Sequence, residues 1–166
     1  MFVLVSHRPM RLLATIRSRC VAVAVPPPAR EAALEWLSGQ GVKDAERWLA
    51  YAGGAPLRAF DYAANAETVD RLLSIIRERG QFPVDDRKEL ELLAETLQKV
   101  ALDQALMAFG APPKYATAPS KVSPAQAKAW LAFARQMGRN RDLARHPLNA
   151  RLFAAEMLAA MPAADG

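Results

Sequence analysis

Residues 85–110, DDRKELELLAETLQKVALDQALMAFG, carry a continuous apolar seam. Its positions step by three, four and three residues, which is the spacing of one face of an α-helix. They are Leu90, Leu93, Leu97 and Val100. We expect this helix to end near Gly110, because Pro112-Pro113 cannot continue it. A long helix with such a seam must bury it against other elements, so the pattern favours a helical bundle.

Two more helices are predicted to complete a bundle over residues 85–166. Ser123-Pro124 is a cap followed by proline at the first helical position, and Asn149 can cap the last helix. The intervening residues 110–124 carry four prolines and predict an exposed loop. Asp85-Asp86 indicates a charged helix start, not a catalytic pair, because adjacent residues do not face each other. The side chains expected to face inward are Ala127, Trp130, Leu131 and Ala134, then Leu152, Ala155 and Leu158.

Residues 26–80 predict a small helical domain of four short helices. Gly39 or Gly41 ends the first helix and Asp44 caps the second. Gly53-Gly54 ends the second, Pro56 opens the third, and Gly80 closes the fourth. The apolar positions are Ala33, Leu34 and Leu37 beside Trp36, then Ala45, Trp48, Leu49 and Ala52, then Leu57 and Phe60, and finally Val69, Leu72, Leu73 and Ile76. Because the chain is interrupted from Gly80 to Val84, we expect no apolar core to be shared with the bundle.

Residues 1–25 predict the end fragment of an α/β domain. Phe2-Val-Leu-Val5 and Val21-Ala-Val-Ala-Val25 are short apolar runs typical of strands in a buried parallel sheet. Two strands cannot bury both of their faces alone, so the rest of the sheet is expected to lie outside this chain. Pro26-Pro27-Pro28 predicts a stiff linker. The predicted fold class is therefore mainly α, with two strands ahead of two helical units.

The composition limits the function classes. Hydrophobic residues at 52% and charged residues at 23% are typical of a soluble globular protein. A single cysteine, Cys20, excludes an internal disulfide and fits a reducing compartment such as the cytoplasm. His7 and His146 are too few for a metal cluster, and no apolar run approaches the roughly 18–20 residues of a membrane span. There is no glycine-rich phosphate loop and no Gly-x-Ser-x-Gly elbow, so we expect neither catalysis by this chain alone nor a cofactor or metal.

The net charge of +5 is unevenly distributed. Residues 104–151 hold eight bases and one acid. Such an excess fits contact with nucleic acid, but it also fits a solvated face or a surface for an acidic protein. The cations are not regularly interleaved with aromatic residues on which bases could stack, which favours the second interpretation.

One motif near the N-terminus points to a family. Leu4-Val-Ser-His-Arg-Pro9 followed by Leu12-Leu-Ala-Thr-Ile-Arg-Ser-Arg-Cys20 resembles the sensor-1 strand and Ser-Arg-Cys motif of bacterial clamp-loader subunits, which are ATPases of the AAA+ type. The resemblance implies that Arg19 is an arginine finger, whose planar fork reaches the phosphates bound by a neighbouring subunit. It also implies a supporting role for Arg17. Cys20 is expected to be a small buried residue. The alternative for Arg19 is an ion pair with a carboxylate of its own domain. The remaining motif residues are Ser6 and Ser18.

The resemblance extends along essentially the whole chain. Residues 53–59, GGAPLRA, resemble the lid motif of the family, and residues 144–152, ARHPLNARL, resemble the end of a collar domain. ATP-hydrolysing subunits carry a sensor-2 arginine where this chain has Leu57, and Arg58 lies one step away, about 100° around a helix. They also commonly have proline where this chain has Leu13. The resemblance therefore implies a subunit that does not hydrolyse ATP. One departure from the family pattern is Val21, where a polar or basic residue is common.

The resemblance assigns three parts: residues 1–25 end the AAA+ core, 26–80 form a helical lid, and 85–166 form the collar that holds the ring of subunits together. The chain would be the C-terminal part of a subunit that helps load the sliding clamp onto primed DNA. The implied partners are the gamma/tau and delta subunits, with no membrane contact. Alternatives are the gamma/tau ATPase subunit itself and a stand-alone helical adaptor that binds nucleic acid through residues 114–151.

The resemblance also bears on which surfaces of the collar meet other subunits. Phe153 and Met157 are the expected interface positions on the last helix. The basic stretch 114–151 is expected to meet a neighbouring subunit, not DNA.

Overall fold

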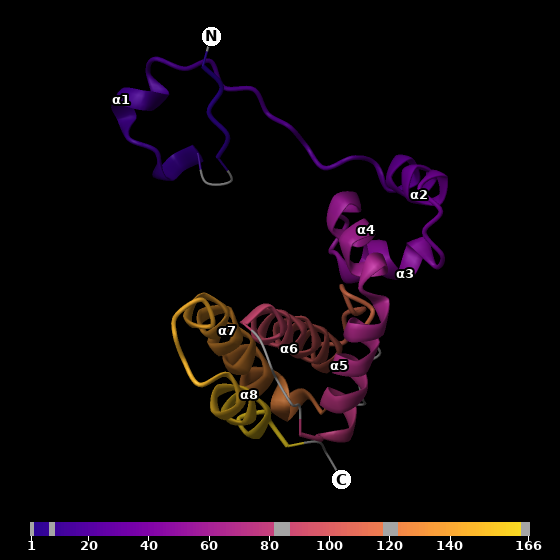
Figure 1. Cartoon of the computed structure of the whole chain (residues 1–166). Coiled ribbons are helices and arrows are strands. Elements are labelled where there is room, and N and C mark those ends of the chain that lie inside the picture. The colour runs from indigo at the N-terminus through magenta and orange to yellow at the C-terminus, as the bar shows by residue number, and fades with distance from the viewer. Residues whose placement is uncertain (1, 7–8, 82–86, 118–122, 164–166) are drawn as a thin grey trace.

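The computed structural model describes residues 2–6, 9–81, 87–117 and 123–163, and its regular elements are helices (Figure 1). In chain order they are η1 (Pro9–Arg11), α1 (Ala14–Arg17), α2 (Arg30–Gly39), α3 (Ala45–Tyr51), α4 (Pro56–Ala64), α5 (Ala66–Glu78), α6 (Arg87–Ala108), η2 (Pro124–Gln126), α7 (Ala127–Leu143) and α8 (Ala150–Ala159). The prediction of a mainly helical chain is confirmed. None of the described helices combines the length and the apolar character needed to cross a membrane. Asp85-Asp86, His7 and Arg8 lie outside the described residues.

The N-terminal segment packs against nothing in the described part of the chain. Residues 2–6 and 21–29 are extended but form no strand, so the two strands predicted at 2–5 and 21–25 are wrong for these residues. A strand is stabilised by pairing its backbone with a neighbour and by covering its apolar face, and neither occurs here. Val23, for example, is 80% exposed. Figure 1 shows this segment, with its short helix α1, apart from the other helices.

Helices α2, α3 and α4 surround a small apolar core. It is formed by Ala33, Leu37, Trp48, Leu49, Tyr51, Ala52, Ala59, Tyr62 and Val69. The predicted helix ends at Gly39 and Pro56 are confirmed. Asp44 does precede α3, but its backbone is left-handed, with φ of 54°, and its side chain makes no capping hydrogen bond. Helix α4 runs through Leu57 and Phe60 as predicted; it turns Ala59 and Tyr62 inward, and Leu57 is 69% exposed.

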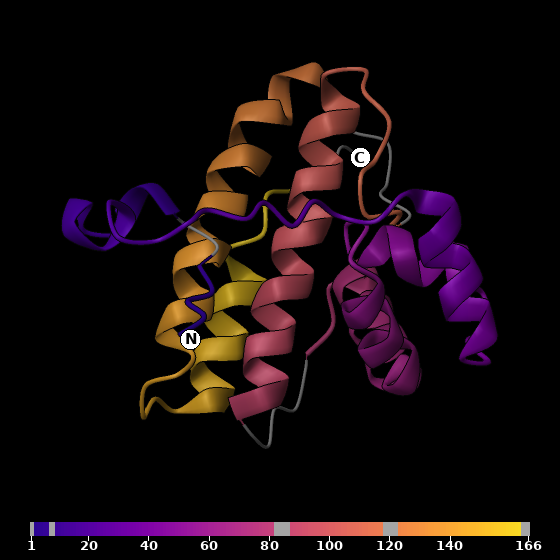
Figure 2. The same cartoon turned by 90° about the horizontal axis from the view of Figure 1, so that it is seen from above.

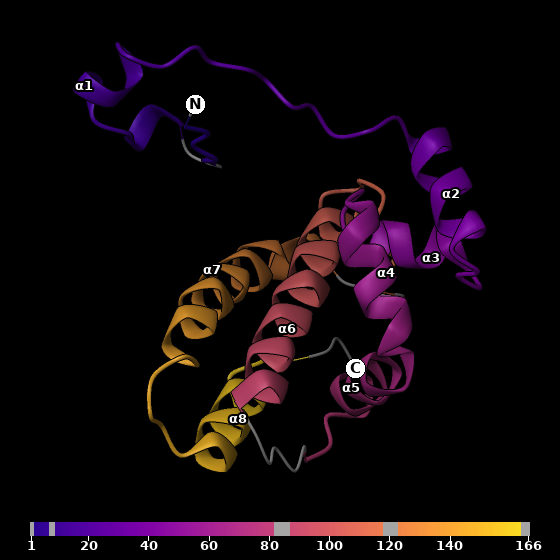
Figure 3. The same cartoon turned by 45° about the horizontal axis from the view of Figure 1, so that its top comes forward.

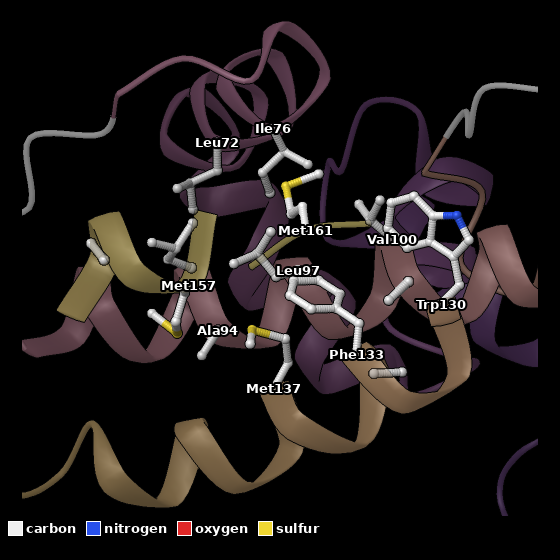
Figure 4. Packing of buried hydrophobic residues seen from close by; sticks show 14 of the residues in the cluster. Leu72, Ile76, Ala94, Leu97, Val100, Trp130, Phe133, Met137, Met157 and Met161 are labelled. Carbon is white, nitrogen blue, oxygen red and sulfur yellow. The ribbon is translucent and has the colours of Figure 1, made fainter. Parts of the chain in front are cut away.

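Helix α6 is the central element of the remaining helices (Figure 2). Helix α7 packs along it and α8 packs against the same side, while α2–α5 lie on the other side. The predicted seam is confirmed, because Leu90, Leu93, Leu97 and Val100 are all buried. Figure 4 shows side chains of α5, α7 and the C-terminal region packed around Leu97 and Val100 of this seam. The partners labelled there are Leu72 and Ile76 from α5, Trp130, Phe133 and Met137 from α7, and Met157 and Met161 from the C-terminal region.

Helix α5 belongs to both apolar cores. Val69, near its start, packs with α2–α4, whereas Leu72 and Ile76 pack with Leu93 and Leu97 of α6. The expectation that no apolar core is shared across residues 80–84 is therefore wrong. Helix α5 ends at Arg79, which has a left-handed backbone, and α5 lies against α6 (Figure 3). The three tryptophans nevertheless stay apart: Trp48 and Trp130 lie in different cores, and Trp36 contacts Phe60.

Helix α8 begins as predicted but buries a different face. The Asn149 side chain accepts a hydrogen bond of 3.1 Å from the Leu152 backbone N–H, so the predicted cap is confirmed. The helix turns Ala154 and Met157 inward, and Leu152 is 69% exposed. Met157 is fully buried and is therefore wrong as an interface position, and Phe153 packs partly against the same core. The small side chain of Ala154 allows α8 to pack closely on the core around α6. The spacing of the leucines in α8 does not reveal that this face is the buried one.

Candidate functional site

The predicted finger residue lies on a short turn after α1. The Arg19 guanidinium donates a 3.0 Å hydrogen bond from Nη1 to the Thr15 carbonyl, and the Ser18 hydroxyl donates to the same oxygen at 3.2 Å. These contacts are local to one helical turn, and Arg19 is exposed. Among the ion pairs between described residues none involves Arg19, so the alternative of an ion pair within its own domain finds no support there. Arg17 makes a separate contact of 3.4 Å with the sulfur of Met10.

The other residues of the N-terminal motif are also on the surface. Ser6 and Ser18 are exposed. Cys20 is exposed as well, so the expectation that it is a small buried residue is wrong for this chain. The physical reason is the one that applies to the whole segment: no described residue packs over it. The structure thus brings Ser18, Arg19 and Cys20 together on one turn through their sequence proximity.

The glycine turn of the predicted lid motif lies close against the ring of Tyr115. Gly53 and Gly54 both have left-handed backbones, with φ of 66° and 92°, which glycine adopts without strain. A Cβ placed on Gly53 would lie 3.1 Å from the ring of Tyr115. The turn therefore needs glycine for its backbone and also for the aromatic ring that covers it. The next helix, α4, carries Leu57 outward.

A buried polar cluster joins this lid region to α6. The Lys99 ammonium lies over the rings of Tyr51 and Tyr62, at 3.7 and 4.0 Å from their centroids. It also lies 3.3 Å from a carboxylate oxygen of Glu95. The Tyr62 hydroxyl donates to Glu95 at 2.6 Å, and the hydroxyls of Tyr51 and Thr96 are 2.8 Å apart. Side chains of α3, α4 and α6 therefore share one polar network, which we call the lid–bundle joint.

Arg58 is a member of this joint. Its guanidinium pairs with Glu95 and contacts the Tyr62 hydroxyl. The arginine nearest to the sensor-2 position is thereby turned towards α6, where its charge is matched by a carboxylate.

Burial and charge shift the pKa values in the joint. Burial lowers the pKa of Lys99 to about 8, although the carboxylate of Glu95 opposes this. Burial pushes the pKa of Glu95 upward, but the Tyr62 hydroxyl, Lys99 and Arg58 outweigh it, so the net pKa is lowered. The pKa values of Tyr51 and Tyr62 are raised, chiefly by burial. At neutral pH the joint therefore holds two cations, one carboxylate and two neutral phenols.

Asp103 fixes the loop that follows α6. Its carboxylate accepts hydrogen bonds from the backbone N–H groups of Lys114, Tyr115 and Thr117, at 2.7, 2.9 and 3.0 Å. It also accepts the Thr117 hydroxyl at 2.8 Å. Both Asp103 and Thr117 are buried. The expectation of an exposed loop over residues 110–124 is therefore wrong at residue 117.

The lid–bundle joint and the hydrogen bonds of Asp103 to the loop involve residues that the sequence patterns did not single out. Glu95, Lys99 and Asp103 are spaced four residues apart, so they form a charged stripe along α6. Such a stripe is ordinarily solvated, and its burial depends on the lid helices and the loop that cover it. Within the part of the chain that the structure describes, no group of three or more His, Cys, Asp and Glu side chains could hold a metal ion.

Comparison with known proteins finds a relative that matches part of the chain. That relative is DNA polymerase III subunit delta′ of Pseudomonas aeruginosa, which is 48% identical over 60 residues. The match covers 34% of this chain and 18% of the relative's length. A partial resemblance to subunit delta′ is thus confirmed. No family model and no solved structure matches the chain.

Proposed function

We propose that this chain is part of a delta′-type clamp-loader subunit, which helps load the sliding clamp onto primed DNA during replication in the cytoplasm. The observation that carries the proposal is the match to a DNA polymerase III subunit delta′. The proposed partners are the gamma/tau and delta subunits, with clamp and primed DNA engaged through the assembled complex. Residues 85–166 act as the collar that holds these subunits together, and residues 26–80 act as the lid.

In this proposal the subunit does not itself hydrolyse ATP. Leu57 stands at the sensor-2 position, where ATP-hydrolysing subunits of the family that the chain resembles carry an arginine. The neighbouring Arg58 is engaged by Glu95 and Tyr62 in the lid–bundle joint. A nucleotide phosphate would have to compete with this carboxylate for the guanidinium. Saturable ATP binding by the full subunit at micromolar affinity, measured by calorimetry, together with a phosphate loop in its preceding sequence, would favour the gamma/tau ATPase assignment instead.

Arg19 is the proposed arginine finger. Its exposure and its local contacts leave the planar fork accessible to phosphates on a neighbouring subunit. A finger acts by stabilising the negative charge on the phosphoryl group in the transition state. It therefore contributes to hydrolysis in the partner and not to nucleotide binding by its own chain.

The test is Arg19→Ala in the full subunit, reconstituted with its ATPase neighbours. Assembly, checked by gel filtration, should be unchanged, while DNA-stimulated ATP hydrolysis and clamp loading should fall. Loss of a finger in trans costs on the order of 10³–10⁵ in rate at one site. Because the loader has several ATP sites, total hydrolysis should fall only in part.

Two matched variants sharpen this test. Arg19→Lys should rescue poorly, because an ammonium cannot reproduce the planar fork. Arg17→Ala removes a guanidinium two residues away and should have a smaller effect. Normal hydrolysis and loading with Arg19→Ala would reject the finger role while leaving the subunit assignment standing.

A further inference from the structure

The outer face of α7 carries a straight stripe of cations. Lys128, Arg135 and Arg139 are all exposed. At 3.6 residues per turn they lie within about 40° of one another around the helix. None of them takes part in the ion pairs formed between described residues. Their charges are therefore available to a partner.

The packing of α7 fixes this stripe on the outside of the bundle. Trp130, Phe133 and Met137 are buried against the core that α7 shares with α6. In Figure 2, α7 runs along α6 at the side of the bundle away from α2–α5. Ala132 is exposed beside the stripe, about 40° around the helix from Lys128, and its small side chain allows an extended partner to approach the helix closely.

We propose that this face of α7 is a docking surface for the phosphate backbone of double-stranded DNA. The stripe spans twelve residues from Lys128 to Arg139, or about 17 Å along the helix axis. Duplex DNA presents one negative charge about every 1.7 Å of its axis, so three cations in a row over this length meet several phosphates. The stretch 104–151 that contains α7 has eight bases and one acid, Asp142. Asp142 is exposed on the same face, three residues after Arg139, so the stripe is cationic from Lys128 to Arg139 and ends beside one carboxylate.

The chemistry of the face favours duplex DNA over two other occupants. Single strands are held largely by stacking on aromatic side chains, and both aromatic residues of α7 are buried. Protein interfaces are anchored by apolar and aromatic residues at their centre, whereas the exposed residue beside the centre of this stripe is the small Ala132. In place of the expected contact between the basic stretch 114–151 and a neighbouring subunit, we infer a contact between α7 and the DNA phosphate backbone. Such a contact has no sequence preference. The inference rests on α7 alone and does not depend on the proposed clamp-loader role.

The test is binding of the 166-residue chain to a fluorescently labelled 20-base-pair duplex, followed by anisotropy from 50 to 200 mM salt. Three phosphate contacts predict a slope of about −2.7 in log K against log salt, which is about a 40-fold loss over this range. The triple variant Lys128→Gln, Arg135→Gln, Arg139→Gln should remove most of this slope and weaken binding at 50 mM. Two duplexes of unrelated sequence should bind equally.

A matched triple variant controls for net charge. Arg11→Gln, Lys43→Gln and Arg77→Gln also remove two arginines and one lysine from exposed positions outside α7. This variant should retain the parent slope. The proposal is overturned if both triple variants bind alike, if the parent chain shows no duplex binding at 50 mM salt, or if a single strand of the same length binds more tightly. It is also overturned if the α7 variant keeps duplex binding but loses binding to a partner subunit, which would assign the face to an acidic protein surface.

Discussion

The segment of residues 2–29 and the helices that follow it contain similar apolar side chains but pack in opposite ways. Valine, leucine and phenylalanine near the N-terminus are exposed, whereas valine and leucine in α5 and α6 are buried. The difference lies in the available partners. A helix with an apolar seam, such as α6, is covered by α5, α7 and α8 of the same chain, but an isolated extended run has no sheet to join. The residues that resemble a functional motif, including Arg19, lie on the uncovered segment, where packing constrains them least.

The largest effect is expected from a substitution that creates a cavity in the apolar core around α6. Leu97→Ala removes a side chain that is 0% exposed, so the free energy of unfolding should fall by about 2–5 kcal/mol. Urea unfolding at neutral pH measures this loss. Leu152→Ala is the matched control, because the same change at an exposed site of α8 should cost less than about 0.5 kcal/mol. Equal losses for the two variants would mean that α8 buries its leucine face after all.

The lid–bundle joint should give the next largest effect, as a dependence of stability on pH. Lys99 has a pKa of about 8 in the folded chain and an ordinary value of 10.5 when unfolded. Between these values the unfolded chain binds more protons, so the free energy of unfolding should rise with pH from about 8 to 10. Each unit by which the pKa of Lys99 differs between the folded and unfolded chain changes the free energy of unfolding by about 1.4 kcal/mol. The free energy of unfolding should therefore rise by roughly 1–3 kcal/mol over this pH range. Above pH 10 the raised pKa values of Tyr51 and Tyr62 should reverse the trend, because phenols ionise first in the unfolded chain.

Lys99→Met isolates the contribution of the lysine to this profile. The rise between pH 8 and 10 should disappear, while the decline from the tyrosines should stay. Glu95 keeps Arg58 as a partner in this variant, and Arg141 is the further cation whose charge bears on Lys99. Lys128→Met, at an exposed site of α7, should follow the parent profile. A Lys99→Met profile parallel to that of the parent would show that another group titrates.

The smallest effect is expected in the N-terminal segment. Val23→Ala should change the free energy of unfolding by less than about 0.5 kcal/mol, because Val23 is 80% exposed. Val69→Ala makes the same change at a side chain with 0% exposure and should cost roughly 1.5 kcal/mol. Both values come from urea titrations of the full chain. A Val23→Ala loss as large as that of Val69→Ala would place the segment in a packed environment.

The sequence predicted the helices better than it predicted their faces. The seam of α6 and the Asn149 cap were predictable because both depend on neighbours within two or three turns. The inward face of α8 was not, because Ala154 carries little hydrophobic weight in a pattern although it sets how closely the helices pack. The sharing of α5 between two cores was hidden for another reason. Val69, Leu72 and Ile76 form one helical stripe, and their spacing does not reveal that different parts of it pack in different cores.

In the candidate site, too, local features could be predicted from the sequence, whereas contacts between distant residues could not. Arg19 was named from its motif, and the structure adds its exposure and its contact with Thr15. The lid–bundle joint could not be found from spacing alone, since Glu95 and Lys99 look like an exposed ion pair on a helix. Only the tyrosines contributed by α3 and α4 turn that pair into a buried one.

The hydrogen bonds of Asp103 to the loop after α6 limit which amino acids this loop can accept when the chain varies between species. Three of the four bonds are received from backbone N–H groups, which every amino acid except proline supplies. Positions 114 and 115 are therefore open to many side chains as far as this anchor is concerned, but closed to proline, in a loop where proline is otherwise common. Asp103 itself has no such freedom: asparagine would replace one accepting oxygen with a donor, and glutamate would move both oxygens by a methylene.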